Sequence, residues 1–201
     1  VVSLEHYYSE RPTSLPRLGL IRCTLRGLEL EFLTASGVFS YRSIDAGTSL
    51  LVETMILPER GRVLDLGCGY GVIGIVAARL NPALEVWLTD VNERALLLAD
   101  ENLKRNSVQN ARVLRGFLYE GLEGIPFDAI LTNPPISSGF KVLEQLVEGS
   151  LRHLRPGGSL QMVVRTNKGG RQAARLLKHH YGGFEVIARR GGYRILKAER
   201  R

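Results

Sequence analysis

Several features that would assign a protein to a structural class are scarce in this sequence of 201 residues. Its two cysteines, Cys23 and Cys68, are too few for a disulfide framework or a cysteine metal cluster. No apolar run approaches the length of a membrane-spanning helix, since charge or glycine interrupts each one. No signal-peptide pattern is visible, and Val1 in place of Met indicates a trimmed start. These absences favour a cytoplasmic protein with no metal and no membrane partner.

The composition that remains is sufficient for one hydrophobic core. With 44% hydrophobic residues, the chain fits one folded unit with an extension. We expect residues 1–57 to be an N-terminal extension packed on a core formed by 58–201. In the extension, the apolar pattern predicts strands over 20–24 and 28–33, with a possible third strand over 38–40.

Helical spacing recurs along the chain, and besides the helices over 72–80, 140–154 and 171–180 it predicts two more. A helix is expected over 50–57, where Asp45 or Thr48 could be the N-cap and Asp45 is the better candidate. A second helix is expected over 92–106, followed by a strand over 111–115. Alternating helices and strands of this kind are typical of an α/β protein.

The stretch 63–74 organises the sequence. Apolar residues up to Leu66 predict a buried parallel strand, glycines then turn the chain, and helical spacing follows. The dinucleotide pattern G-x-G-x-x-G matches the letters G-Y-G-V-I-G, which is a weak signal alone. Asp65 at the strand end would repel a pyrophosphate but suits an ammonium group.

A second acid ends the next predicted strand, over 84–90. Asp90 lies at the distance from the glycine loop where a carboxylate accepts from both hydroxyls of a ribose. Nicotinamide dinucleotide sites use the same device. Asp90 therefore indicates a cofactor with an adenosyl group, and it does not distinguish a nicotinamide dinucleotide from other adenosyl cofactors.

The segment 132–136, Thr-Asn-Pro-Pro-Ile, follows a predicted strand over 127–131. An amino group conjugated to a base, or an amide, is a poor nucleophile because its lone pair is delocalised. The side-chain oxygen of Asn133 and the carbonyl of Pro134 can accept both of its N–H hydrogens and so direct the lone pair. Two prolines keep that backbone rigid. The pattern favours chemistry at an amino nitrogen.

These segments together resemble the small-subunit ribosomal RNA guanine-N2 methyltransferases of the C and G types, class I enzymes that use S-adenosylmethionine (SAM). The resemblance lies in 37–40, 45–51, 65–71 and 132–136, and extends over about residues 7–197. Bacterial members carry two such domains in tandem, and single-domain archaeal relatives are most similar in plan. The resemblance implies an α/β, Rossmann-like class I methyltransferase fold. This is a seven-stranded mixed sheet flanked by helices, with a small β-rich N-terminal extension.

The resemblance also implies roles for individual residues. The cofactor-binding candidates are Thr48, Asp65, Gly67, Cys68, Gly69, Asp90, Val91, Phe117 and Asn133. Many relatives have, at the position of Phe117, an acid that binds the adenine amino group, so an aromatic wall and backbone hydrogen bonds are expected here instead. Asn133, Pro134 and Pro135 are the implied catalytic residues.

Two residues are candidates for contact with the target base. Phe39 is equally suited to core packing and to base stacking. Ile136 follows the two prolines, where adenine- and glutamine-modifying relatives have Tyr or Phe, so it favours guanine. His6, Tyr7 and Tyr8 could fold over the pocket, although an apolar plug at a sheet edge is the preferred interpretation.

Charge is distributed unevenly along the chain. Residues 139–201 hold 14 Lys or Arg against four Asp or Glu, a net +10, whereas the rest has a net −3. On a methyltransferase core, this pattern indicates a polyanionic substrate, although a solvated surface in an Arg-rich protein has the same pattern. Arg171 and Arg175 share one helix face, and Arg190 and Arg194 flank a hairpin turn. We expect these four to contact RNA, which is the predicted partner.

Other functions stay open at this stage. The same Asn-Pro-Pro segment would serve a protein-glutamine N5-methyltransferase or a tRNA N-methyltransferase, although the basic C-terminal third argues against a protein substrate. A non-catalytic SAM- or RNA-binding subunit is a further alternative, with Phe117 as an early mark of decay. The acids Asp65 and Asp90, together with Asn133, argue for an enzyme. The sequence specifies neither the target nucleotide nor the oligomeric state.

Overall fold

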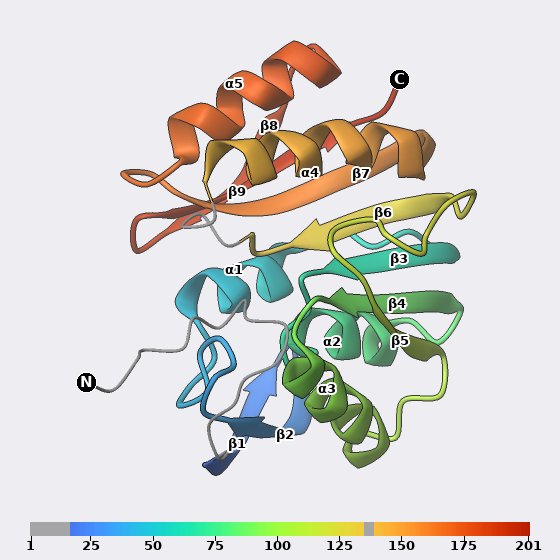
Figure 1. Ribbon diagram of the computed structural model, residues 1–201, viewed down its shortest axis with the longest axis vertical. Helices are drawn as coiled ribbons and strands as arrows, with labels where there is room; N and C mark the ends of the chain where they lie inside the picture. Colours follow the sequence, from blue (N-terminus) through green and yellow to red (C-terminus); the bar gives the residue numbers. More distant parts are fainter. Residues whose placement is uncertain (1–16, 135–138) are drawn as a thin grey trace.

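The structure of the protein is a computed structural model, and it describes residues 17–134 and 139–201. Its elements in chain order are β1 (Leu18–Leu25), β2 (Leu28–Ala35), α1 (Ala46–Thr54), β3 (Gly61–Leu66), α2 (Val72–Leu80), β4 (Leu84–Asp90), α3 (Glu93–Arg105), β5 (Ala111–Arg115), β6 (Phe127–Thr132), α4 (Phe140–His153), β7 (Leu154–Arg165), α5 (Gly170–Tyr181), β8 (Glu185–Arg190) and β9 (Tyr193–Glu199). Figure 1 shows a sheet between two groups of helices, with the β1–β2 hairpin apart from it.

The main sheet has seven strands in the order β5-β4-β3-β6-β7-β9-β8. All neighbours are parallel except β9, which runs antiparallel to both β7 and β8. The strand order reverses between β3 and β6. In open α/β sheets, ligands bind at such a reversal, beyond the carboxyl ends of the strands. The predicted seven-stranded mixed sheet is confirmed.

Two hydrophobic clusters cover the two faces of this sheet. Side chains alternate between faces along a strand, and on β3 Val63 joins the cluster under α1, α2 and α3, whereas Leu64 and Leu66 join the cluster under α4 and α5. The central strands are buried on both sides, which explains their nearly continuous apolar sequence.

The N-terminal hairpin packs on the same core. Strands β1 and β2 pair antiparallel, from Leu18 with Ala35 to Leu25 with Leu28. Phe32 of β2 is fully buried in the cluster that also contains residues of α2 and α3. One apolar cluster therefore crosses the boundary expected near residue 57.

Two local predictions are wrong. The third strand expected over 38–40 is a turn, because Gly37 and Ser40 adopt left-handed φ values of 83° and 55°. The helix expected over 50–57 starts earlier, at Ala46, and ends at Thr54. Its N-cap is Asp45, as expected, whose carboxylate accepts from the backbone N–H groups of the first turn.

The other elements lie close to their expected positions. Asn92 caps α3, its Oδ1 accepting from the N–H groups of Arg94 at 3.0 Å and Ala95 at 3.3 Å. The C-terminal hairpin turns between Arg190 and Tyr193. Within residues 17–134 and 139–201, no helix is long and apolar enough to cross a membrane. The same residues include no group of three metal-ligating side chains close enough to hold an ion.

Candidate active site

A cavity of about 390 Å³ opens where the strand order reverses, which is a volume typical of small-molecule sites. It is lined by residues 38–40, 66–70, 89–91, 116–118 and 132–134, with further side chains from α1, α2, α3 and α4. The carboxyl ends of β3, β4 and β6 thus meet there, as the three strand-end motifs of the sequence predict.

The glycine loop after β3 forms one wall. The N–H groups of Gly67 and Cys68 both donate to the carbonyl of Thr89, at 2.9 Å each, and fasten the loop to β4. Gly67 and Gly69 have φ values of 74° and 56°, which favour glycine. A Cβ at either position would contact nothing within 4 Å, so open space lies beside the loop backbone.

Asp90 ends β4 and faces the cavity. Its Oδ2 accepts from the N–H of Gly69 at 2.8 Å, and its Oδ1 accepts from the N–H of Asn92 at 2.9 Å. Burial raises the pKa of this carboxyl, and the same backbone N–H groups oppose that shift. Each carboxylate oxygen keeps a further lone pair. Asp90 can therefore fasten the loop and still accept from a ribose.

Asp65 lies beneath the loop and does not line the cavity. It is fully buried, and its Oδ2 accepts from the N–H of Gly74 at 2.8 Å, close to the start of α2. Among the described residues, its Oδ1 has no hydrogen-bond partner. Burial raises the pKa of Asp65 to about 7, the Gly74 N–H opposes the shift, and Asp90 adds to it. Its expected contact with a cofactor stays a prediction.

Asn133 follows β6 on the opposite wall. Its Nδ2 donates to Oδ2 of Asp45 at 3.0 Å and to Oγ1 of Thr48 at 2.9 Å. The Asp45 carboxylate has no hydrogen to donate, so the atom of Asn133 that faces it must be the donor Nδ2. The same carboxylate oxygen also accepts from the N–H groups of Gly47 and Thr48, at 2.8 and 3.0 Å. The Asn133 amide is therefore oriented, and its Oδ1 is the atom left to accept from a ligand.

Asp45 lines the cavity and contacts Asn133, although its sequence context indicates only a helix cap. It lies 88 residues before Asn133, and only the fold brings the two together. Tyr193 of β9 also reaches its Oδ1, with the hydroxyl at 3.4 Å. The start of α1, the end of β6 and the start of β9 thus meet at one carboxylate.

The structure brings most predicted site residues to this cavity. The predicted residues that line it are Phe39, Thr48, Gly67, Cys68, Gly69, Asp90, Val91, Phe117, Asn133 and Pro134. Their individual binding roles stay predictions. Pro135, Ile136 and the expected aromatic residues 6–8 lie outside the described residues.

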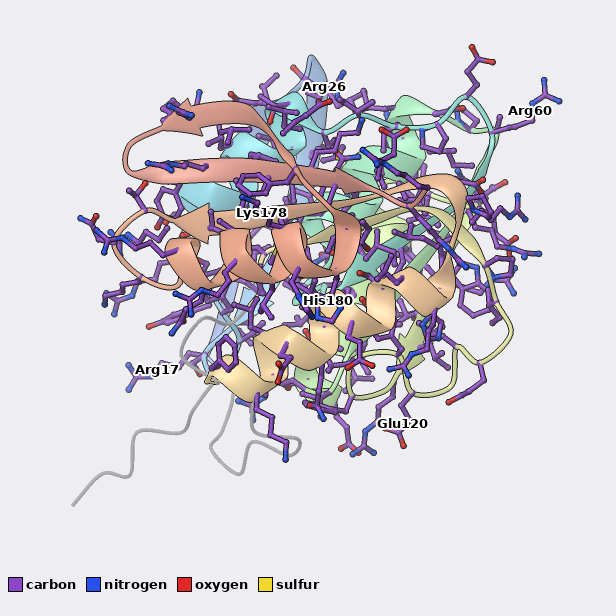
Figure 2. All side chains as sticks on the ribbon, turned by 90° about the horizontal axis from the view of Figure 1, so that it is seen from above. Arg17, Arg26, Arg60, Glu120, Lys178 and His180 are labelled. Atoms are coloured by element: carbon purple, nitrogen blue, oxygen red, sulfur yellow. The ribbon has the colours of Figure 1, made fainter. Side chains whose placement is uncertain are left out.

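The four predicted RNA-contacting arginines do not line the cavity. Arg171 and Arg175 are exposed on α5, which is in the foreground of Figure 2 with Lys178 and His180 labelled. Arg190 pairs with Glu53 of α1 at 2.8 Å, and Arg194 is half-buried. The β8–β9 turn between Arg190 and Arg194 lies beside the carboxyl end of β7, at the edge of the sheet where the cavity opens.

The charges that line the cavity discriminate between cofactors. Its described lining includes two carboxylates, those of Asp45 and Asp90, and no Lys or Arg. A pyrophosphate would be repelled, whereas a sulfonium or ammonium group would be attracted. The open space at Gly67 and Gly69 and the accepting capacity of Asp90 also fit SAM. The dinucleotide alternative is therefore disfavoured by the site itself.

Comparisons with known proteins agree with this geometry. The family model "Methyltransferase small domain" matches residues 29–197. The uncharacterized protein YbxB of Bacillus subtilis is 36% identical over 198 residues, which is 98% of each chain. Ribosomal RNA small subunit methyltransferase C of Serratia proteamaculans is 34% identical over 174 residues, or 85% of this chain and 49% of that protein.

A solved structure adds the cofactor. The 16S rRNA N2 methyltransferase of T. thermophilus, in complex with AdoMet and guanosine, is 32% identical and has a TM-score of 0.83. The match covers 94% of this chain and 52% of that one, so the chain spans about half the length of the ribosomal methyltransferases it matches. The protein thus belongs to the methyltransferase small domain family and is a SAM-dependent methyltransferase.

Proposed function

We propose that the protein methylates an exocyclic amino nitrogen of RNA, and that guanine N2 of small-subunit ribosomal RNA is the acceptor. The observation that carries this proposal is the orientation of Asn133. Because Asp45 and Thr48 occupy its Nδ2, the Oδ1 is available to accept an N–H from an amino group. A hydroxyl or carbon acceptor would not need such a group.

The reaction needs positioning more than acid–base chemistry. When bound, SAM supplies an electrophilic methyl group on a sulfonium. Asn133 Oδ1 and the carbonyl of Pro134 accept the two N–H hydrogens of the acceptor and direct its lone pair out of the plane of the base. Asp45 and Thr48 hold that amide still, which lowers the entropic cost of reaching the reactive geometry. The proton that methylation makes acidic leaves to solvent.

Two further observations support RNA as the substrate. Residues 139–201 carry the net charge of +10. Arg194 follows Tyr193, whose hydroxyl lies 3.4 Å from Asp45 in the cavity lining. Arg171 lies in the first turn of α5, which follows β7 in the chain. Two matched relatives are named for methylation of small-subunit ribosomal RNA, and one was solved with guanosine. Within this chain, the basic surface of residues 139–201 is the candidate for contact with RNA.

The test is a methyl-transfer assay with labelled SAM and several acceptors. These are undermethylated small-subunit RNA, assembled small subunits lacking the modification, bulk tRNA and a release-factor-like protein. N2-methylguanosine in small-subunit RNA, lost in Asn133→Ala, is the expected result. Label only in tRNA or in protein glutamine would overturn the proposed acceptor and leave the cofactor assignment intact. SAM binding without any transfer would favour a non-catalytic subunit.

A further inference from the structure

The edge of β2 that faces away from β1 is paired, within the described residues, with side chains of α3. Asn102 Oδ1 accepts from the N–H of Leu33 at 2.7 Å, and its Nδ2 donates to the carbonyl of Leu33 at 3.0 Å. Asn106 repeats this at Glu31, accepting at 3.1 Å and donating at 2.8 Å. Four residues along a helix span about 6 Å and two along a strand about 6.5 Å, so the two amides match the strand edge.

The two asparagines differ in one hydrogen bond. Asn102 Nδ2 also donates to the carbonyl of Tyr70, at 2.9 Å, in the glycine loop after β3. Asn106 Nδ2 instead donates to the carbonyl of Asn102, at 2.9 Å, within its own helix. Both side chains are buried, with exposed fractions of 0% and 4%. The strand contacts are thus the same in kind, and only Asn102 reaches the cofactor loop.

Tyr70 lies at the centre of that loop. Before it, the Gly69 N–H is held by Asp90, and after it the Gly71 N–H donates to the Cys68 carbonyl at 2.9 Å. The Tyr70 ring packs edge-on against Phe32 of β2, with 6.0 Å between the ring centroids. The Tyr70 carbonyl, which accepts from Asn102 Nδ2, is therefore part of a loop that lines the cavity.

We propose that Asn102 is a positioning residue for the cofactor and couples the N-terminal hairpin to the glycine loop. A buried carbonyl without a donor is costly, so the loop keeps its conformation only while Asn102 is in place. Docking of β2 fixes the Asn102 amide, and the amide fixes the Tyr70 peptide. Because coupling between two sites is reciprocal, SAM binding also stabilises the docked hairpin. The coupling depends on the cofactor alone and holds whichever acceptor is methylated.

Asn106→Ala is the matched control for Asn102→Ala, since each removes one amide from the edge of β2. We expect both variants to lower the melting temperature. The dissociation constant for SAM, measured by calorimetry well below each melting temperature, should rise about tenfold in Asn102→Ala and less than twofold in Asn106→Ala. In turnover assays, KM for SAM should rise with kcat unchanged. Equal affinities in the two variants would show that Asn102 is only structural.

A measurement on the unchanged protein tests the same coupling without relying on a folded variant. Amide exchange is followed by NMR with and without saturating SAM. The N–H of Leu33, held by Asn102, should slow more on SAM addition than the N–H of Glu31, held by Asn106. Equal slowing at the two positions, or none at Leu33, would overturn the proposal.

Discussion

The two halves of the sheet offer different kinds of candidate ligand contact. On the side of β3 and β4, the groups that face the cavity are backbone atoms and carboxylates fixed by hydrogen bonds, such as Asp90 between Gly69 and Asn92. On the side of β7, β8 and β9, the candidate contacts are exposed arginines, among them Arg171 and Arg175. Rigid, buried groups suit one cofactor of fixed shape, whereas exposed cations suit a polyanion held largely by charge. Asn133 lies between the two halves.

The largest effect on activity is expected for substitution of Asn133. Asn133→Ala removes the acceptor for the amino group and should lower kcat by about 100-fold or more, because a single preorganised polar group at a reacting centre contributes that much. Because Asn133 is also a cofactor-binding candidate, the dissociation constant for SAM should rise as well, but by less than tenfold. Asn133→Asp should be equally inactive, since it places a second carboxylate beside Asp45. Steady-state kinetics and calorimetry check both variants, and a tenfold loss of SAM affinity would contradict the separation of the two halves.

On the β3 and β4 side of the sheet, a large effect on SAM affinity is expected from Asp90→Asn. The amide keeps the shape of the side chain but turns a donor toward one of the two backbone N–H groups that the carboxylate now accepts. The dissociation constant for SAM should rise about 10- to 100-fold, the range for a lost hydrogen bond to a charged group. Binding of RNA without cofactor, measured by fluorescence anisotropy, should stay within twofold. A parallel loss of RNA binding would mean that the halves are not independent.

The buried carboxyl beneath the loop predicts a pH dependence. Because the pKa of Asp65 is raised to about 7, the folded protein keeps this proton between about pH 4 and 7 while the unfolded chain releases it. The free energy of unfolding should therefore fall as pH rises through this window and level off above it. Between pH 5 and 8, the decrease should be about 2 kcal/mol larger in the wild type than in Asp65→Asn. Urea unfolding at both pH values measures this, and parallel curves would rule out a titrating Asp65.

The smallest effects are expected for the exposed cations. The double variant Arg171→Ala with Arg175→Ala should weaken RNA binding about three- to tenfold and reduce the salt dependence of the affinity. Arg60→Ala is the control, because Arg60 is exposed before β3, at the amino-terminal edge of the strand (Figure 2). The control should leave RNA affinity unchanged within twofold. Equal effects at the two places would mean that binding follows net charge alone.

The cofactor half could largely be predicted from the sequence. Strand ends, glycines and acids follow one another within short segments, so the loop after β3 and the position of Asp90 are local properties of the chain. The wrong prediction over 38–40 is also local, because the left-handed backbone of Ser40 has no sequence signature as strong as that of a glycine.

Contacts between distant segments could not be predicted. The hydrogen bond from Asn133 to Asp45 joins positions 88 residues apart, and the Asp-Ala-Gly-Thr segment signals only a helix start. The pairing of Asn102 with β2 is similar, since the strand contributes backbone atoms that leave no mark on its sequence. Asp65, a cofactor-binding candidate, is fully buried and does not line the cavity, and its contact with a cofactor stays a prediction.

The carboxylate of Asp45 has a consequence for how the protein can change over generations. The same group caps the first turn of α1 and orients the amide of Asn133, so Asp45→Ala would remove a helix cap and misplace the amide together. Most proteins can exchange some stability for activity, or the reverse, because different residues govern the two. At position 45, loss of the carboxylate would cost both properties together, because one oxygen, Oδ2, accepts the hydrogen bonds of the helix cap and of the Asn133 amide. Selection for helix stability and selection for the Asn133 orientation therefore act on the same atom.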